Sequence, residues 1–229
     1  MNPKKQTIII LHGWGHSADL WQNMKKKLEN AGFEVIADDL PGFGSMAGKA
    51  IDFGIKDYAN WFENQYKEII TNEKIILIGH SLGGRIAIEL AQNNPKWLEK
   101  LILIGTPGIY QPTPKTKLLK NLSFLKNLPL FGLLASSFNP EYESAKLSNL
   151  KETYQNVVGY DQKSILYTIH SSTFLIWGEK DFVVPISIAL EMNKLILDSK
   201  LKLIPNSGHS PHLDSPDLLF GILNNYLKK

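Results

Sequence analysis

Short apolar runs alternate along this 229-residue chain with longer segments whose apolar residues recur at helical spacing. Several short runs are apolar at every position, which is typical of parallel strands covered by helices on both faces. The expected strands are Thr7–Leu11, Phe33–Ala37, Lys74–Gly79, Leu101–Ile104, Thr173–Trp177 and Leu201–Ile204. The expected helices are Leu20–Asn30, Ile55–Thr71, Gly83–Gln92, Pro185–Leu197 and Pro216–Leu227. This alternation predicts an α/β fold with a mostly parallel sheet of about six strands.

The segment 107–171 breaks the alternation, because it contains no clear strand pattern. Helical periodicity is present at Lys115–Asn127 and Ser144–Tyr154. A long connection that adds no strand to the core is usually functional. We therefore expect an α/β core made of residues 1–106 and 172–229, with residues 107–171 inserted as a small helical cap or lid.

The amino-acid composition excludes several kinds of functional site. The chain has no cysteine, which excludes disulfides, thiolate metal sites and a cysteine nucleophile. The net charge is only +3 and Arg85 is the single arginine, so we expect no nucleic-acid partner. No apolar run is long enough for a secretory signal or a membrane span. These features predict a cytoplasmic protein without an integral membrane segment.

A G-x-S-x-G pattern, Gly79-His80-Ser81-Leu82-Gly83, lies between an expected strand and an expected helix. A serine at such a sharp turn presents its hydroxyl at the helix N-terminus, where it can act as a nucleophile. The alternative is a serine that only caps the helix between two glycines. The strand–turn–helix context favours Ser81 as a nucleophile.

A serine nucleophile needs a base and a group that orients the base, and in this type of sheet the chain order is Ser, Asp, His. His209 follows the last expected strand, and His212 is the alternative base three residues later. Asp181 follows the strand Thr173–Trp177, and Glu179, nearer the strand end, is the alternative acid. We expect Asp181 and His209 to complete a triad with Ser81.

The loop after the first strand supplies the remaining part of such a site. Its glycines allow backbone N–H groups to face a substrate oxygen, so we expect an oxyanion hole formed by the amides of Trp14 and Leu82. His12 is expected to brace this loop. His12 and His16 have metal-ligand spacing, but the glycines between them indicate a loop rather than a ligand helix. We expect no metal and no cofactor.

The chain resembles the α/β-hydrolase superfamily, and within it the cap-bearing small esterases and carbon–carbon-bond hydrolases. The resemblance implies Ser81 as nucleophile, Asp181 as orienting acid and His209 as base. The chain departs from the family in one respect: we expect no leading antiparallel strand pair, although family members usually have one. LHGWG together with DLPGFG is also similar to carboxylesterases that act on a carrier-protein ester. The matching stretches are LHGWG (Leu11–Gly15), DLPGFG (Asp39–Gly44), GHSLGG (Gly79–Gly84), GTPG (Gly105–Gly108), WGEKDFVVP (Trp177–Pro185) and GHSPHLDSP (Gly208–Pro216).

These features together predict a serine hydrolase that cleaves a small-molecule carboxylic ester through an acyl-enzyme. A carbon–carbon-bond hydrolase acting on a dienoic ring-cleavage product is an alternative that uses the same triad, and a non-catalytic receptor on this fold is another. The expected cap is basic, which suggests an acidic acyl-carrier protein or a membrane surface as partner, although a cap helix with solvated lysines is the favoured explanation. Its lysines are Lys115, Lys117, Lys120 and Lys126.

Overall fold

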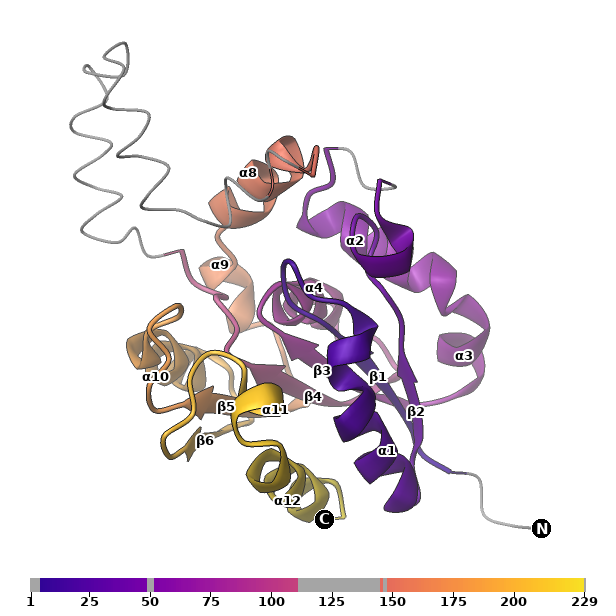
Figure 1. Cartoon of the computed structure of the whole chain (residues 1–229), viewed down its shortest axis with the longest axis vertical. Coiled ribbons are helices and arrows are strands. Elements are labelled where there is room, and N and C mark those ends of the chain that lie inside the picture. Colours follow the sequence, from indigo (N-terminus) through magenta and orange to yellow (C-terminus); the bar gives the residue numbers. More distant parts are fainter. Residues whose placement is uncertain (1–4, 49–51, 111–144, 146–147, 229) are drawn as a thin grey trace.

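The computed structural model describes residues 5–48, 52–110, 145 and 148–228. Six parallel strands form one sheet in the order β2-β1-β3-β4-β5-β6 (Figure 1). All the expected strands are confirmed, and no antiparallel strand pair occurs in the described sheet. The strands are β1 (Thr7–Leu11), β2 (Glu34–Ala37), β3 (Ile75–His80), β4 (Leu98–Ile104), β5 (Ser172–Gly178) and β6 (Ser199–Ile204).

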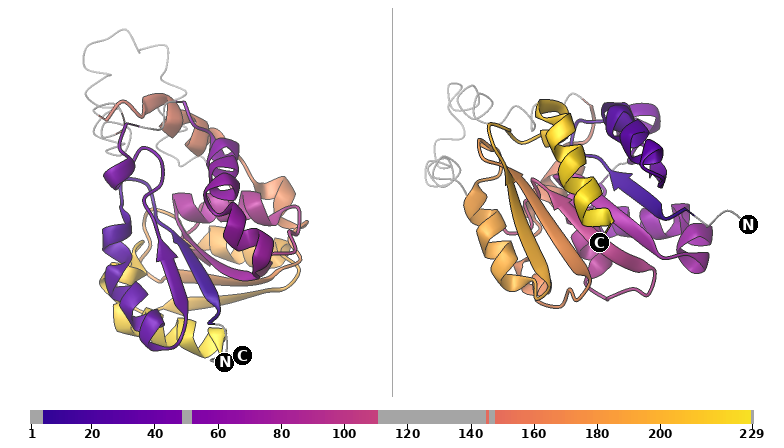
Figure 2. Two further views of the ribbon diagram at one scale, coloured as in Figure 1. Left: turned by 90° about the vertical axis from the view of Figure 1, so that its right-hand side faces the viewer. Right: turned by 90° about the horizontal axis from the view of Figure 1, so that it is seen from below.

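Helices cover both faces of the sheet, and alternate residues of each central strand pack against opposite layers. On β1, Ile8 and Ile10 face α1 (Gln22–Asn30) and α12 (Pro216–Leu227), which lie side by side on one face (Figure 2). Ile9 and Leu11 pack in the other layer. That layer contains α2 (Ile55–Gln65), α4 (Leu82–Ala91) and α10 (Ile186–Leu195). Burial on both faces is the reason why the central strands contain continuous apolar runs.

The expected single helix Ile55–Thr71 is wrong in one respect: it is two helices, α2 and α3 (Lys67–Asn72), that meet at Tyr66. Tyr66 has φ −107° and ψ 17°, outside the α-helical region. Its buried hydroxyl donates a hydrogen bond of 3.0 Å to the Asp38 carboxylate. The break therefore coincides with a contact between residues far apart in the sequence, Tyr66 and Asp38. The segment has no glycine or proline that would have indicated a helix end.

Two helices lie in the described part of the expected cap, α8 (Lys151–Gly159) and α9 (Lys163–Leu166). The helix expected at Ser144–Tyr154 overlaps α8 only at the start of α8. Asn149 has φ 57°, a left-handed conformation that an α-helix cannot continue through. The expected helix Lys115–Asn127 and the four cap lysines lie outside the described residues.

The segment around α9 is attached to the helix that follows the nucleophile turn. The Gln162 side chain donates to the Arg85 carbonyl of α4 at 2.9 Å, and the Arg85 guanidinium donates to the Tyr160 carbonyl. Burial lowers the pKa of Arg85 to about 10, and nearby Asp161 partly opposes this shift. In the described part of the chain, no helix is long and apolar enough to cross a membrane.

The remaining short helices lie in loops. They are the 3-10 helices η1 (Ala18–Trp21) and η2 (Gly44–Met46), and the single-turn α11 (Pro211–Asp214). The loops that carry η1, η2 and α11 follow β1, β2 and β6, respectively. The carboxyl ends of the parallel strands meet at one edge of the sheet, which is where open α/β sheets place their sites.

Candidate active site

Ser81 occupies the turn between β3 and α4 with φ 50° and ψ −112°. A non-glycine residue in this region costs about 1–3 kcal/mol and persists only where its surroundings hold it. Here the Ser81 amide donates to the Ile104 carbonyl at 3.0 Å, and the Ser81 carbonyl accepts from the Arg85 amide at 3.2 Å. The strain is therefore held by backbone contacts on both sides, and the side chain is left to project from the turn.

Glycines are required on both sides of Ser81 because the backbone is crowded there. A Cβ at Gly79 would lie 2.5 Å from the Gly83 carbonyl oxygen, and a Cβ at Gly83 would lie 2.2 Å from the Leu11 carbonyl oxygen. Gly13, in the loop after β1, would bring a Cβ to 3.3 Å from the Ser81 Cβ. The G-x-S-x-G pattern thus reflects the close approach of β1, β3 and α4.

Asp181 and His209 meet beside this turn. His209 Nδ1 lies 2.8 Å from Asp181 Oδ2, and the Asp181 side chain is 1% exposed. The other oxygen, Oδ1, accepts the Val183 and Val184 amides at 2.9 and 2.8 Å. A carboxylate can only accept, so the imidazole carries its proton on Nδ1, and Nε2 has the free lone pair of a base.

The alternative acid, Glu179, and the alternative base, His212, do not take part in this contact. Glu179 is exposed, one residue beyond the end of β5. His212 is buried in α11, with its ring stacked on Trp21 at 4.1 Å between centroids. Burial, assisted by His16 and His209, lowers the pKa of His212 to about 3. Among the described residues, Asp181 and His209 are the acid–histidine pair in contact near Ser81.

His12 joins two of the loops at this edge. Its Nδ1 donates to the Gly13 carbonyl at 2.8 Å, while its Nε2 accepts the Leu40 amide at 2.9 Å. Burial lowers the pKa of His12 to about 4, so the ring stays neutral and keeps both bonds. His12 therefore fixes the loop that carries Trp14 to the loop after β2.

The expected oxyanion donors lie on either side of the nucleophile turn. Leu82 is the first residue of α4, and an amide in the first turn of a helix has no partner within that helix. Trp14 follows Gly13, whose backbone runs against Ser81. The turn and the β1 loop thus bring the Leu82 and Trp14 segments to the same edge of the sheet.

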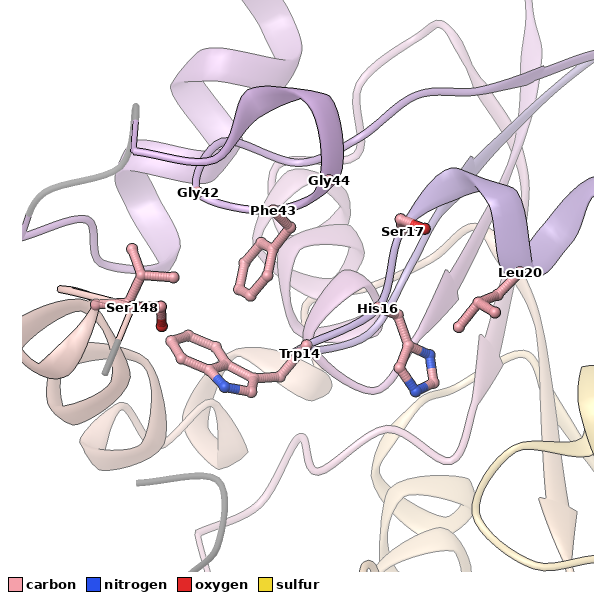
Figure 3. Close-up of a pocket in the computed structure, with 10 residues that line it drawn as sticks. Trp14, His16, Ser17, Leu20, Gly42, Phe43, Gly44 and Ser148 are labelled. Atoms are coloured by element: carbon pink, nitrogen blue, oxygen red, sulfur yellow. The ribbon is translucent and has the colours of Figure 1, made fainter. Parts of the chain in front are cut away.

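A cavity of about 480 Å³ opens next to these loops (Figure 3). Trp14 packs edge-on against Phe43 at 5.0 Å and against Tyr154 of α8 at 5.1 Å between ring centroids. Leu150, in the segment leading to α8, also lines the cavity. Part of the wall is therefore aromatic and aliphatic, which suits an apolar group, and the rest consists of glycines, serines and His16.

Three of the residues around this cavity were not singled out from the sequence: Phe43, Leu150 and Tyr154. Phe43 lies in the DLPGFG stretch, so that motif was a signal for it. Asp39, at the start of the same stretch, accepts the Ala18 amide at 2.8 Å and the Ser45 amide at 2.7 Å. Burial alone would raise the pKa of Asp39, but these hydrogen bonds outweigh it and lower the pKa.

Comparison with known proteins agrees with the fold. A family model described as "alpha/beta hydrolase fold" matches residues 6–134. A Pseudomonas putida 2-hydroxy-6-oxononadienedioate/2-hydroxy-6-oxononatrienedioate hydrolase is 26% identical, over 89% of this chain and 81% of its own. The pimeloyl-[acyl-carrier protein] methyl ester esterase of Wigglesworthia glossinidia brevipalpis is 27% identical, over 97% and 93%. An Exiguobacterium antarcticum esterase superposes with a TM-score of 0.79 at 22% identity, over 99% and 93%.

Proposed function

Because this chain belongs to the α/β-hydrolase fold family, we propose that it is a serine hydrolase that cleaves carboxylic esters through an acyl-enzyme. Ser81 is the nucleophile, His209 the general base and Asp181 the group that orients the base. The observation that carries this proposal is the 2.8 Å contact between His209 Nδ1 and Asp181 Oδ2. It supplies a base of defined tautomer at the sheet edge where Ser81 is held in a strained turn.

The reaction follows from these assignments. His209 Nε2 takes the Ser81 hydroxyl proton as Oγ attacks the ester carbonyl carbon. The resulting imidazolium is stabilised by the Asp181 carboxylate and returns its proton to the leaving alcohol, which leaves an acyl-serine. Water then attacks the acyl group with His209 again as base, and the carboxylic acid leaves as Ser81 Oγ recovers the proton.

Two further parts of the site support ester cleavage. The amides of Trp14 and Leu82 are the proposed donors to the oxyanion, and one lost donor of this kind costs about 10²–10³ in kcat in other hydrolases. The cavity beside Trp14 and Phe43 is the proposed pocket for an apolar part of the substrate. Its volume of about 480 Å³ suits a small or medium acyl ester.

The direct test is covalent labelling of the wild-type protein with a fluorophosphonate, followed by peptide mapping. We expect a single adduct, on Ser81. In parallel, the Ser81→Ala variant should lose at least about 10³-fold in kcat on a short p-nitrophenyl ester, with a small residual rate from binding and the oxyanion hole. Wild-type turnover by Ser81→Ala would refute the nucleophile assignment, and an unlabelled, inactive wild-type protein would favour a receptor instead.

A second candidate function is carbon–carbon-bond hydrolysis of a dienoic ring-cleavage product. It is favoured by the similarity to the Pseudomonas putida hydrolase, whose name gives an unsaturated hydroxy-oxo diacid as its substrate. The same three residues would serve both reactions, so the triad does not discriminate between them. A panel of p-nitrophenyl esters of increasing acyl length, run against a dienoic ring-cleavage substrate, compares kcat/KM directly. Higher kcat/KM on the ring-cleavage compound would replace the esterase proposal.

The similarity to the Wigglesworthia esterase raises a carrier-protein ester as the substrate. The sequence between Ile109 and Asn139 contains Lys115, Lys117, Lys120 and Lys126 and no acidic residue. A basic segment of this kind would steer an acidic carrier in a salt-dependent way. We therefore expect kcat/KM on an acyl-carrier-protein methyl ester to fall with added salt more steeply than on the free methyl ester. Equal salt dependence for the two substrates would remove the carrier protein as a partner.

A further inference from the structure

Three imidazoles that the proposed mechanism does not use lie together behind the nucleophile turn. His16 comes from the loop after β1, His80 from the end of β3 and His212 from α11. One ring nitrogen from each can be chosen so that all three atoms lie within 4.8 Å of one another. We propose that His16, His80 and His212 form a binding site for a divalent transition-metal ion of the zinc type.

The lone pairs needed for such a site are available. His80 Nε2 donates to the His209 carbonyl at 2.9 Å, so its proton is on Nε2 and Nδ1 carries the lone pair. Within the described residues, His80 Nδ1, His16 Nδ1 and both nitrogens of His212 are buried without a hydrogen-bond partner. Buried polar atoms are normally satisfied, and a group of them that converges calls for a ligand.

One ion can be coordinated after a small movement of the rings, because nitrogens on a tetrahedral Zn²⁺ are about 3.4 Å apart and these lie within 4.8 Å of one another. The centroids of the three rings are 4.8 Å (His80–His212), 5.5 Å (His16–His80) and 5.7 Å (His16–His212) apart. With Zn–N bonds of about 2.0–2.1 Å in tetrahedral geometry, ring centroids are about 5 Å apart. The His16 ring lies at 15° to the His80 ring, so we expect it to turn when the ion binds.

The donor set selects the class of ion. Three imidazole nitrogens without a carboxylate suit Zn²⁺, Co²⁺, Ni²⁺ or Cu²⁺, whereas Mg²⁺ and Ca²⁺ prefer oxygen ligands. His80 and His212 are 1% and 3% exposed. Ligand imidazoles must be neutral, which suits two rings that are buried, within the described part of the chain, without an acidic partner. His16 also lines the cavity beside Trp14, which provides a path for the ion.

An ion at this site would oppose the proposed hydrolysis, an effect that rests on the function proposed above. The His80 ring lies 5.0 Å from the His209 ring, and the two are joined by the hydrogen bond from His80 Nε2 to the His209 carbonyl. A nearby dication disfavours the positively charged imidazolium that His209 forms in each half of the reaction. Occupancy is therefore expected to inhibit the enzyme reversibly.

The test measures binding without reference to activity. Wild-type protein, first treated with a chelator, is titrated with Zn²⁺ by calorimetry and with Co²⁺ by visible absorption. We expect one equivalent to bind, with the d–d bands of low-coordinate Co²⁺. His212→Phe, which keeps an aromatic ring against Trp21, and His16→Asn, at a less buried position, should each weaken binding at least about tenfold. His170→Asn, which removes an exposed histidine, is the matched control and should bind like wild type.

Two outcomes would overturn the site: no saturable binding to wild type, or unchanged binding to both His212→Phe and His16→Asn. His209→Gln separates this site from the proposed triad, because it should lose hydrolysis and still bind Co²⁺. Loss of the Co²⁺ spectrum in His209→Gln would mean that the ion binds at the triad instead.

Zn²⁺ should lower wild-type esterase activity and leave His212→Phe much less affected. Equal inhibition of both proteins would refute the inhibitory role.

Discussion

At the scale of single residues, Asp181 divides its carboxylate between two different tasks. Oδ1 accepts two backbone amides, from Val183 and Val184, and Oδ2 faces His209 Nδ1. The two N–H donors would hold an oxygen at the Oδ1 position in any isosteric replacement. An asparagine at this position must therefore present its NH₂ group to His209.

This geometry predicts the effect of Asp181→Asn. With an amide N–H facing it, His209 Nδ1 must accept, so its proton moves to Nε2 and the base toward Ser81 is lost. We expect kcat on a p-nitrophenyl ester to fall by roughly 10³–10⁴, with KM little changed and Tm within a few degrees of wild type. Glu179→Gln, which alters the exposed acid two residues earlier, should retain activity. More than a tenth of wild-type kcat in Asp181→Asn would contradict the assigned tautomer.

Much of this site was predictable from residues alone, and the reason is positional. Ser81, Asp181 and His209 each follow a strand, and parallel strands bring their carboxyl ends to one edge. The cluster of His16, His80 and His212 was not predictable, since its members come from a loop, a strand end and a short helix whose meeting depends on the packing of Trp21 and α11. The spacing of His12 and His16 indicated no metal site, and His12 is a loop brace.

At the scale of elements, the central strands β1, β3, β4 and β5 were the most predictable, because burial on both faces leaves a mostly apolar run in the sequence. The edge strands β2 and β6 are partly exposed and contain polar residues. The helix ends were less predictable. Tyr66 breaks the expected Ile55–Thr71 helix where its hydroxyl reaches Asp38, and Asn149 precedes α8 with a positive φ. Both features depend on contacts or backbone angles that local composition does not encode.

The packing of α4 on β1 gives a prediction at this scale. Gly83→Ala places a methyl group 2.2 Å from the Leu11 carbonyl oxygen, a backbone atom that a side-chain rotation cannot relieve. We expect the free energy of unfolding to fall by about 1–3 kcal/mol and esterase activity to fall as well, because the nucleophile turn must shift. Urea unfolding and kcat on a p-nitrophenyl ester provide the two measurements.

Gly221→Ala in α12 is the matched control. It is the same chemical change in a helix, but the new methyl group meets no atom within 4 Å. Only the better helix propensity of alanine remains, so stability should rise by about 0.5–1 kcal/mol. Similar shifts of the same sign in Gly83→Ala and Gly221→Ala would contradict the close approach of β1 and α4.

At the scale of the whole molecule, most of the histidines lie at the carboxyl edge of the sheet, and three of them are buried: His12, His80 and His212. Four of the six, His12, His16, His80 and His212, have a lowered pKa, with burial as the largest cause in each. In the unfolded chain these rings take up a proton near pH 6.5. The native state resists that proton, so acid favours unfolding.

His12 allows the size of this effect to be measured. Its pKa is about 4 in the folded protein, so the unfolded state binds one more proton than the native state between about pH 6.5 and 4. His12 therefore contributes stability that is present above pH 6.5 and is lost at about 1.4 kcal/mol per pH unit below it.

His12→Gln should be less stable than wild type at pH 7.5, because the bridge from Gly13 to Leu40 is disturbed. On acidification, the free energy of unfolding of His12→Gln should nevertheless fall less steeply than that of wild type. The difference in slope corresponds to about one proton, or about 1.4 kcal/mol per pH unit. Urea unfolding of both proteins, in buffer that contains a chelator, measures the dependence of the unfolding free energy on pH from 7.5 to 5. Equal slopes for wild type and His12→Gln would mean that His12 is already charged in the folded protein.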